Sequence, residues 1–387
     1  MDIVKLIDNK KLVNWRRHLH MYPEIGFNEH ETTKYIAEQI AAYPGIEVLR
    51  PTETGLVAVL KGGKPGKIIG LRADIDALPI LEEADVEFKS KNPGIMHACG
   101  HDCHAAMLLG AVDALYKIKE SLHGTIKFIF QHAEEVFPGG AKGLIASGVL
   151  DDVEAFYGCH VGVESVTGTV GLAAGPVYAN ADSFSIKIQG RGSHAAGPQA
   201  SIDPLLIGTE IVQALNFIVS RNIAPHDAAV VTVASFNAGT AHNIIPDTAK
   251  ILGTARSYKA EVRDLIESRI KGIAHSICRA YGATCEVEYQ RGYNCVVNDE
   301  GLHQFLHEIV PKVLPDVVVD KLEPRMGGED FSEYATIAPA FFARIGAATE
   351  GKEYLAHHPG FTINEGCLPI GSALYTAFAA FILKMSY

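Results

Sequence analysis

The sequence predicts an α/β fold with a mostly parallel sheet, into which a smaller α+β domain is inserted. Short apolar runs typical of buried strands alternate with helical patterns in the first half of the chain. Polar clusters follow three of these strands at the same end. The alternation changes between 180 and 294 and resumes near Asn298. We therefore assign 1–179 and 295–387 to a catalytic domain and 180–294 to an inserted domain.

Composition sets limits on function. The 387 residues are long for one domain, and 48% hydrophobic against 20% charged residues is ordinary for a globular enzyme. The net charge of −11 argues against nucleic acid or an anionic membrane as partner. No long apolar stretch or signal-peptide core appears, so we expect no membrane span. Seven thinly spread cysteines indicate a reducing cytoplasm and not a disulfide framework.

The first half of the chain reads as helices and buried strands in turn. Two helices are expected within 11–42, and the alternation over 45–60 predicts an antiparallel strand pair. Buried strands are expected over three short apolar runs, at 67–71, 125–130 and 155–159. Each is followed by polar residues: Asp74 and Asp76, then 132–135, then His160. Because open α/β sheets place their sites at the carboxyl ends of strands, we expect these clusters to meet.

The segment 97–104 is the richest in metal ligands, with three histidines, two cysteines and an aspartate. A helical pattern follows it, and Asp102 is the expected N-cap. A helix N-terminus would then lower the thiol pKa of Cys99, and the thiolate binds metal. A His-rich structural turn, a redox pair and a cysteine nucleophile are the alternatives. The Cys99/Cys103 spacing does not fit a redox pair, and metal binding is favoured.

The inserted domain and the end of the chain complete the fold. The order β-α-β-β-α-β, typical of a ferredoxin-like split βαβ unit, is expected from segments at 184–188, 203–220, 229–234, 248–254, 261–281 and 285–289. The last third predicts a helix from Glu300, a strand at 341–345, a loop at 355–361 and an apolar helix at 368–385.

Five metal ligands can be gathered from strand ends and loops: Cys99, His101, Glu135, His160 and one of His357 or His358. Five ligands exceed the four of one tetrahedral ion, so two ions sharing a bridging thiolate are favoured. Adjacent Glu134 and Glu135 point in different directions. One can therefore bind metal while the other faces a metal-bound water.

The chain resembles the M20 metallopeptidase family, in particular its amidohydrolase subgroup of hippurate hydrolases, auxin-conjugate hydrolases and N-acetyldiaminopimelate deacetylases. The matching motifs span nearly the whole chain: RRHLH at 16–20 with PE at 23–24, LRADIDALP at 71–79, HACGHDCH at 97–104, HAEE at 132–135, GRGSHA at 190–195, NIIPD at 243–247, GTAR at 253–256, GEDF at 328–331 and HHP at 357–359.

The resemblance implies a role for each ligand. Cys99 would bridge two ions, and Glu134 would be the general base on a metal-bridging water. The terminal ligands would be His101, Glu135, His160 and His357, the last because it stands two residues before Pro359. Cys103 departs from the family, where glycine is more usual. The resemblance favours Mn²⁺, whereas a thiolate with imidazoles also suits Zn²⁺.

The resemblance also assigns residues in the inserted domain, which would act as a lid. Asn243 and Arg256 would bind substrate, Arg256 by pairing with the carboxylate of an amino acid; a surface salt bridge is its alternative. His194 would donate to the oxyanion, and related enzymes supply this histidine from the partner subunit of a dimer. A histidine acting within its own chain, or only capping a turn, is the alternative.

The predicted function is two-metal hydrolysis of the amide bond of small N-acyl amino acids, by a homodimer formed through the lid. A dipeptidase or aminopeptidase on the same scaffold is the alternative. A metal-dependent binding protein would not need Glu134 as a base. A cysteine hydrolase using Cys99 would not need the metal.

Overall fold

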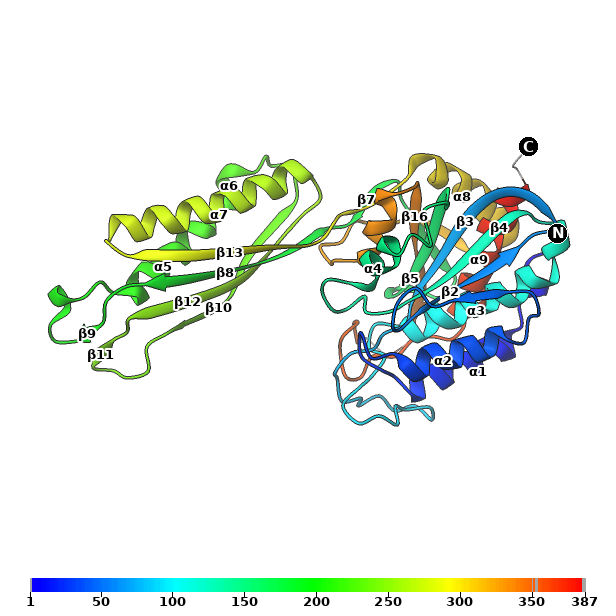
Figure 1. The fold of residues 1–387 in the computed structure, drawn as a ribbon, viewed down its shortest axis with the longest axis horizontal. Helices are drawn as coiled ribbons and strands as arrows, with labels where there is room; N and C mark the ends of the chain where they lie inside the picture. The colour runs from blue at the N-terminus through cyan, green and yellow to red at the C-terminus, as the bar shows by residue number, and fades with distance from the viewer. Residues whose placement is uncertain (1, 350, 352–353, 385–387) are drawn as a thin grey trace. The chain divides into compact units, whose positions relative to one another are not determined.

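The computed structural model describes residues 2–349, 351 and 354–384, which form two compact units (Figure 1). The first unit combines Met1–Val177, Val296–Glu323 and Asp330–Tyr387, and the second combines Tyr178–Cys295 with Pro324–Glu329. No helix in the described part of the chain is long and apolar enough to cross a membrane.

The first unit is built on an eight-stranded sheet of order β1-β2-β4-β3-β5-β16-β6-β15. Its four central strands, β4, β3, β5 and β16, run parallel, which confirms the predicted fold class. β1 and β2 form the predicted antiparallel pair. The strands are β1 Glu47–Leu49, β2 Leu56–Lys61, β3 Lys64–Asp74, β4 His123–Gln131, β5 Ala155–Val166, β6 Thr169–Leu172, β15 Val318–Lys321 and β16 Ala340–Ala348.

Aromatic side chains attach helices to both faces of this sheet. Adjacent residues of a strand point to opposite faces. Tyr157 therefore stacks on Phe378 of α9 with ring centroids 4.9 Å apart, whereas Phe156 meets Tyr334 of η4 at 5.0 Å. The elements around the sheet are α1 Asn9–Met21, α2 His30–Ile40, α3 His101–Lys117, α4 Gly140–Ala146, α8 Glu300–Val313, η4 Asp330–Thr336 and α9 Cys367–Lys384, with β7 Gly175–Tyr178 paired to β14 Val296–Asn298. Met385, the expected end of the last helix, lies outside the described residues.

The second unit has a four-stranded antiparallel sheet of order β10-β12-β8-β13, with helices α5 and α7 between its strands in the chain. The single helix expected at 203–220 is wrong. It is divided at Asn216, whose side-chain amide donates to the Val212 carbonyl at 2.8 Å. The elements are β8 Asn180–Gln189, β9 Ser193–His194, α5 Pro204–Leu215, α6 Phe217–Asn222, β10 Ala229–Ala238, β11 Ile244–Ile245, β12 Thr248–Ser257, α7 Ala260–Ala280 and β13 Thr284–Tyr293.

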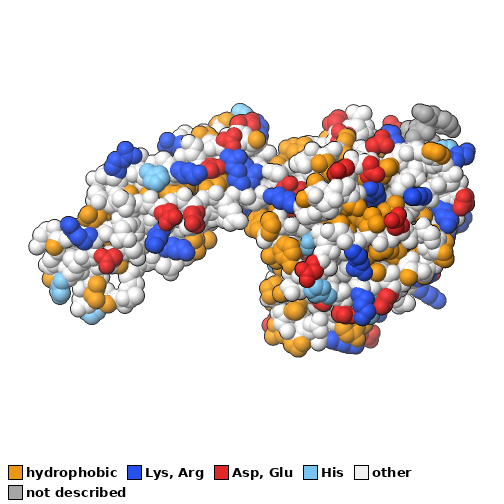
Figure 2. Space-filling model, in the orientation of Figure 1, with side chains coloured by type: hydrophobic (Ala, Val, Ile, Leu, Met, Phe, Trp, Pro, Cys, Tyr) orange, Lys and Arg blue, Asp and Glu red, His pale blue; other side chains and the backbone are white. Residues whose placement is uncertain are grey.

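A short segment assigned from the sequence to the first domain belongs to the second unit. Residues 324–329 return to the start of β8, where Arg325 forms a parallel bridge with Tyr178 and the Gly327 carbonyl accepts a hydrogen bond from Ala179 N at 3.0 Å. The segment has no hydrophobic pattern that would announce this return. On the face of each unit that Figure 2 shows, acidic and basic side chains are interspersed.

Candidate metal centre

The carboxyl ends of three parallel strands bring the predicted polar clusters together. β3 lies between β4 and β5, with Asp74 opposite Gln131 and Leu71 opposite Tyr157. The turn after β4 carries Glu134 and Glu135, and His160 lies on β5 itself. The loop before α3 supplies Cys99, and α3 begins at His101.

Cys99 belongs to two groups of possible metal ligands. One group contains Cys99, His101 and His160, and the other contains Cys99, Glu135 and His357, with the ligand atoms of each group within 4.8 Å of one another. Cys99 Sγ lies 3.4 Å from His160 Nε2, and His357 Nε2 lies 3.0 Å from Glu135 Oε1. All five residues predicted as ligands thus meet around one sulfur atom.

Hydrogen bonds fix the ring orientations of two histidines. His101 Nδ1 lies 3.0 Å from the Asp76 carbonyl oxygen and 3.1 Å from Asp76 Oδ1, so it carries the proton. His160 Nδ1 donates in the same way to the Val161 carbonyl at 2.6 Å. In both rings the Nε2 lone pair is left to face the cluster, which is how metal-binding histidines are commonly oriented.

Asp76 and the two glutamates form one unit. Asp76 Oδ2 accepts the backbone N–H of Glu135 at 2.9 Å while Oδ1 holds His101. Asp76 therefore joins the turn that carries both glutamates to the ligand His101. Glu134 is buried, and its carboxylate lies in a group with His101 and Glu135. One glutamate thus faces His357 while its neighbour stands beside His101.

The loop at the end of the chain distinguishes His357 from His358. His357 has φ 70° and donates its backbone N–H to the Ala98 carbonyl at 2.8 Å, next to Cys99. His358 stacks on Tyr354 at 4.2 Å, and its Nδ1 accepts Gly360 N. The structure therefore brings His357, and not His358, into the cluster.

Two expectations about the start of α3 are wrong. The N-cap is Gly100, at φ 93°, and Asp102 lies within the first turn. Its carboxylate is used elsewhere, accepting from Arg16 Nε at 2.7 Å and contacting His20 Nδ1 at 2.9 Å. The pKa of Cys99 is also not lowered. Burial, and then the nearby Glu135 carboxylate, raise it to about 12, because both disfavour the charged thiolate.

The residues fit a divalent cation. His101 Nε2 is completely buried without a hydrogen-bond partner, which is costly unless a ligand is bound there. Burial lowers the pKa of His101, but Asp74 and then Cys99 raise it well above its usual range. The carboxylate beside the ring thus favours a positive charge, which a metal ion at Nε2 would supply in place of a proton. Imidazole, thiolate and carboxylate ligands are those used by Zn²⁺ and other transition metals.

Comparison with known proteins agrees with this geometry. The model of the peptidase family M20/M25/M40 matches residues 70–380. The chain belongs to this family. It is 43% identical to the N-acyl-L-amino acid amidohydrolase of Geobacillus stearothermophilus (78% of this chain, 82% of that one) and 39% identical to N-acetylcysteine deacetylase of Bacillus subtilis (97% of each). The crystal structure of the Bacillus subtilis YXEP protein, described as a dinuclear metal-binding peptidase from the M20 family, matches with a TM-score of 0.85 at 35% identity, over 97% of this chain and 98% of that one.

The family and these relatives establish the M20 chain as a metal-dependent hydrolase acting on amides. A dinuclear relative and the two ligand groups around Cys99 support two divalent ions.

Two predicted residues of the inserted unit lie together at one tip. β9 pairs with β11, so that His194 is opposite Ile244, and the Asn243 carbonyl accepts Ala195 N at 3.0 Å. His194 and Asn243 are both exposed. His194 Nδ1 accepts Ala196 N at 3.1 Å, so the proton of the neutral ring sits on Nε2, which can donate outward.

Arg256 lies on β12 of the four-stranded sheet, at the end of that strand farther from β11. It pairs with Ala181, whereas Thr248, at the end nearest β11, pairs with Gln189. Eight residues of strand separate these positions by about 26 Å. The structure therefore does not bring Arg256 and His194 of one chain together.

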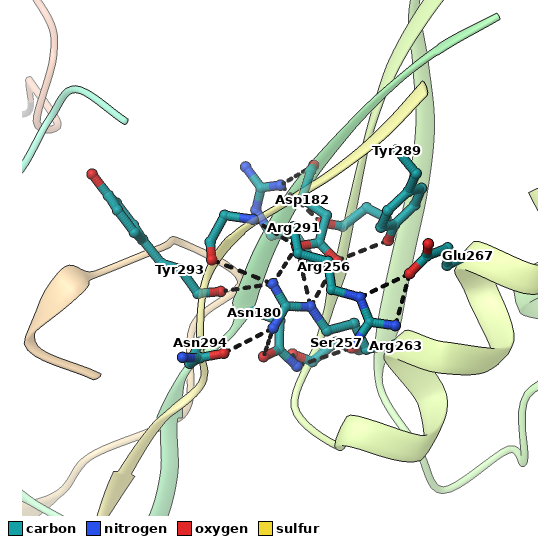
Figure 3. Close-up of polar contacts among 12 residues, drawn as sticks. Asn180, Asp182, Arg256, Ser257, Arg263, Glu267, Tyr289, Arg291, Tyr293 and Asn294 are labelled. Atoms are coloured by element: carbon teal, nitrogen blue, oxygen red, sulfur yellow. Dashed lines mark hydrogen bonds and ion pairs between the residues drawn. The ribbon is translucent and has the colours of Figure 1, made fainter. Parts of the chain in front are cut away.

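Figure 3 shows the surroundings of Arg256. One guanidinium nitrogen, Nη1, donates to the Asp182 carbonyl at 3.3 Å, to the Ala255 carbonyl at 2.9 Å and to Thr254 Oγ1. The Asp182 carboxylate is instead held by Arg263, with Nε–Oδ2 at 2.9 Å. Within the described residues Arg256 forms no ion pair, so the salt bridge considered as its alternative is not found there.

The buried pairing of His104 with Asp74, behind the ligands, was not predicted from the sequence. His104 Nδ1 lies 2.5 Å from Asp74 Oδ1, and its Nε2 accepts Val161 N at 2.9 Å. This pair joins α3 to β3 and β5 next to His160. The motif at 71–79 drew attention to Asp74, but nothing in the sequence indicated that His104 is its partner, because the two residues are 30 positions apart.

Proposed function

We propose that the chain hydrolyses the amide bond of N-acyl amino acids, with two divalent ions held by Cys99, His101, Glu135, His160 and His357. The observation that carries this proposal is the pair of ligand groups sharing Cys99, with buried Glu134 beside them. Relatives named for N-acyl-amino-acid hydrolysis and N-acetylcysteine deacetylation support the substrate class.

The residues supply acid–base chemistry. Bound divalent ions would polarise the substrate carbonyl and acidify the attacking water. Glu134 accepts a proton from that water and passes it to the leaving amine nitrogen. Asp76 keeps both His101 and the Glu135 backbone in place during this transfer. We favour Mn²⁺ by family resemblance; Zn²⁺ is the alternative that a thiolate with imidazoles favours.

A homodimer through the second unit is part of the proposal. Arg256 and His194 of one chain are too far apart to contact one small substrate, so we propose that His194, as oxyanion donor, and Asn243 come from the partner. The edge position of β10 and the exposed apolar side chains of Leu206 and Phe217, 64% and 58% exposed, support a subunit contact here.

Arg256 would pair with the carboxylate of the amino acid. Its guanidinium is bound through Nη1 alone among the described residues, and a planar guanidinium can bind a carboxylate with two nitrogens at once. The alternative of a dipeptidase or aminopeptidase is kept because YXEP is described as a peptidase. All seven cysteines lie among the described residues as free thiols, in keeping with a cytoplasmic location.

The test is a hydrolysis panel. Purified protein would be loaded with Mn²⁺ or Zn²⁺ and given N-acetyl, N-benzoyl and N-indoleacetyl amino acids together with dipeptides. We expect hydrolysis of N-acyl amino acids that a chelator abolishes and added metal restores. Preference for unblocked dipeptides would support the alternative. Iodoacetamide should not inactivate the metal-loaded protein; inactivation without metal loss would point to a cysteine hydrolase.

A further inference from the structure

The turn that carries Glu134 and Glu135 has an unusual backbone. Ala133 has φ 50°, in the left-handed region that residues other than glycine and asparagine avoid. An alanine stays there only if its surroundings hold it. Its carbonyl accepts Gly140 N at 3.2 Å, and a Cβ on Gly26 would lie 3.2 Å from Ala133 Cα, so the turn is tightly enclosed.

The N–H of Ala133 is held by a carboxylate from a distant part of the chain. Glu29 Oε1 accepts it at 2.7 Å, and Glu29 Oε2 accepts the Thr54 hydroxyl at 2.9 Å. Glu29 is fully buried. It occupies the N-cap position of α2, yet its side chain does not cap that helix. Glu24 bonds the first-turn amides instead, with Thr32 N at 2.8 Å.

Within the described part of the chain, no cation pairs with the Glu29 carboxylate, which is bound by the Thr54 hydroxyl and the Ala133 N–H. Burial, and then Asp76, raise the pKa of Glu29 to about 7. Burying an acid in this way opposes folding, so simple stabilisation does not explain it. Glu29 and Asp76 both bind the backbone of the turn that carries Glu134. Asp76 holds the N–H of Glu135, and Glu29 holds the N–H of Ala133, so two carboxylates fix the backbone on either side of Glu134.

We propose that Glu29 is a positioning residue, which acts through the Ala133 N–H to hold Glu134 and Glu135 in their working orientation. This proposal rests on the proposed function only where it concerns Glu134 as the general base. The effect of Glu29 on Glu135 is an effect on metal retention. The part of Glu29 that matters is an acceptor at Oε1, which glutamine also provides.

The main test compares Glu29→Leu, which removes both acceptors, with Glu29→Gln, which keeps one. Zn²⁺ affinity by calorimetry, kcat on N-acetylmethionine and amide hydrogen exchange of 132–136 without metal are measured. We expect Glu29→Leu to weaken Zn²⁺ binding and kcat by about tenfold or more and to speed exchange in the turn. Glu29→Gln should stay within about threefold of the native protein.

Thr33→Val is the matched structural control. Thr33 is buried nearby and accepts Gly55 N at 2.8 Å, so its loss removes a comparable hydrogen bond without touching Ala133. We expect normal Zn²⁺ affinity and kcat per folded molecule. If folded Glu29→Leu behaves like Thr33→Val in both measurements, or if Glu29→Gln loses as much as Glu29→Leu, the proposal is wrong.

A rescue experiment tests the mechanism. Ala133→Gly adopts the left-handed backbone without strain, so combined with Glu29→Leu it should recover about threefold or more of the lost Zn²⁺ affinity and kcat. No recovery would overturn the proposed route through Ala133. Should Glu29→Leu not fold, Thr54→Val loosens Glu29 instead. We then expect amide hydrogen exchange at 132–136 to be faster in Thr54→Val than in the native protein, and near the native rate in Glu29→Gln, which keeps the acceptor. Unchanged exchange in Thr54→Val would overturn the proposal.

Failure of the proposed function is distinguishable from failure of this inference. If the native protein hydrolyses nothing in the panel, the proposed function is wrong, but the Zn²⁺ affinities and exchange rates of the Glu29 variants still decide whether Glu29 positions the turn.

Discussion

The metal centre and the tip of the second unit are built in opposite ways. Around Cys99, His101 and Glu134 are buried, Glu135 and His160 are half-buried, and His357 is exposed. Asp76 and the Val161 carbonyl fix the rings of His101 and His160. At the tip, His194 and Asn243 are exposed, and His194 is oriented by a single backbone N–H. The first region is preorganised within one chain. The second presents donors that need another surface before they can act.

The buried site can be argued from the residues because strand ends, ligand types and hydrogen bonds all agree on one location. At the exposed tip, the roles of His194 and Asn243 are instead assigned by their motifs, GRGSHA at 190–195 and NIIPD at 243–247. Two kinds of variant therefore test the two regions. One separates loss of catalysis from loss of metal, and the other separates a residue acting within its own chain from one acting in the partner's site.

The largest effect is expected at Glu134. Glu134→Gln should keep both metals and lose about 10²–10⁴-fold in kcat, because a general base is removed without a ligand. Glu135→Gln should instead lower metal content, since Glu135 lies with Cys99 and His357. Elemental analysis and kcat on the same preparations separate the two. If the phenotypes are exchanged, the roles of the two glutamates are reversed.

The next largest effect tests sharing between subunits. Loss of an oxyanion donor costs about 10²–10³-fold in kcat, so His194→Ala and Glu134→Gln should each be nearly inactive. Mixed and allowed to exchange subunits, they should recover activity, because one site of the heterodimer regains both groups. Heterodimers demonstrated by mass spectrometry that stay inactive would show that His194 does not act in trans.

Much of the fold was predictable because the determining signals are local. Runs such as 125–130 and 155–159 are short and apolar, and each lies within an observed strand of the parallel sheet. The missed features depend on distant contacts. Asp102 looked like a cap but is held by Arg16, 86 residues away, and 324–329 returns to Tyr178 without an apolar pattern.

The site shows the same division. Ligand types at strand ends, such as Glu135 and His160, were readable because metal binding restricts residue type. The groups behind them were not, because a carboxylate such as Glu29 becomes informative only when it is found buried against Ala133. The choice between His357 and His358 likewise needed the loop backbone, which directs one ring to Glu135 and the other to Tyr354.

Preorganisation should carry a cost in stability that depends on pH. The pKa of Glu29 is about 7 in the folded chain against an ordinary value of 4.5. Between these values the unfolded chain loses its proton first, so native stability falls as pH rises from 4.5 through 7. Glu29→Gln should therefore gain relative to the native protein over this window, by at most about 3 kcal/mol. Urea unfolding in chelator at pH 4.5 and 8 measures this; a pH-independent difference would contradict it.

The smallest effect is expected at Arg256, which lies on β12 of the four-stranded sheet, away from the tip. Arg256→Lys keeps the charge but loses the planar pair of donors, so KM for N-acyl amino acids should rise with little change in kcat. Because Nη1 is anchored on the carbonyls of Asp182 and Ala255, the substituted lysine also loses that support. The matched substrate is an N-acyl amino acid amide, which lacks the carboxylate. Its KM should be high in the native protein and insensitive to Arg256→Lys. Equal sensitivity of acid and amide would mean that Arg256 supports the sheet around Asp182 and does not bind the carboxylate.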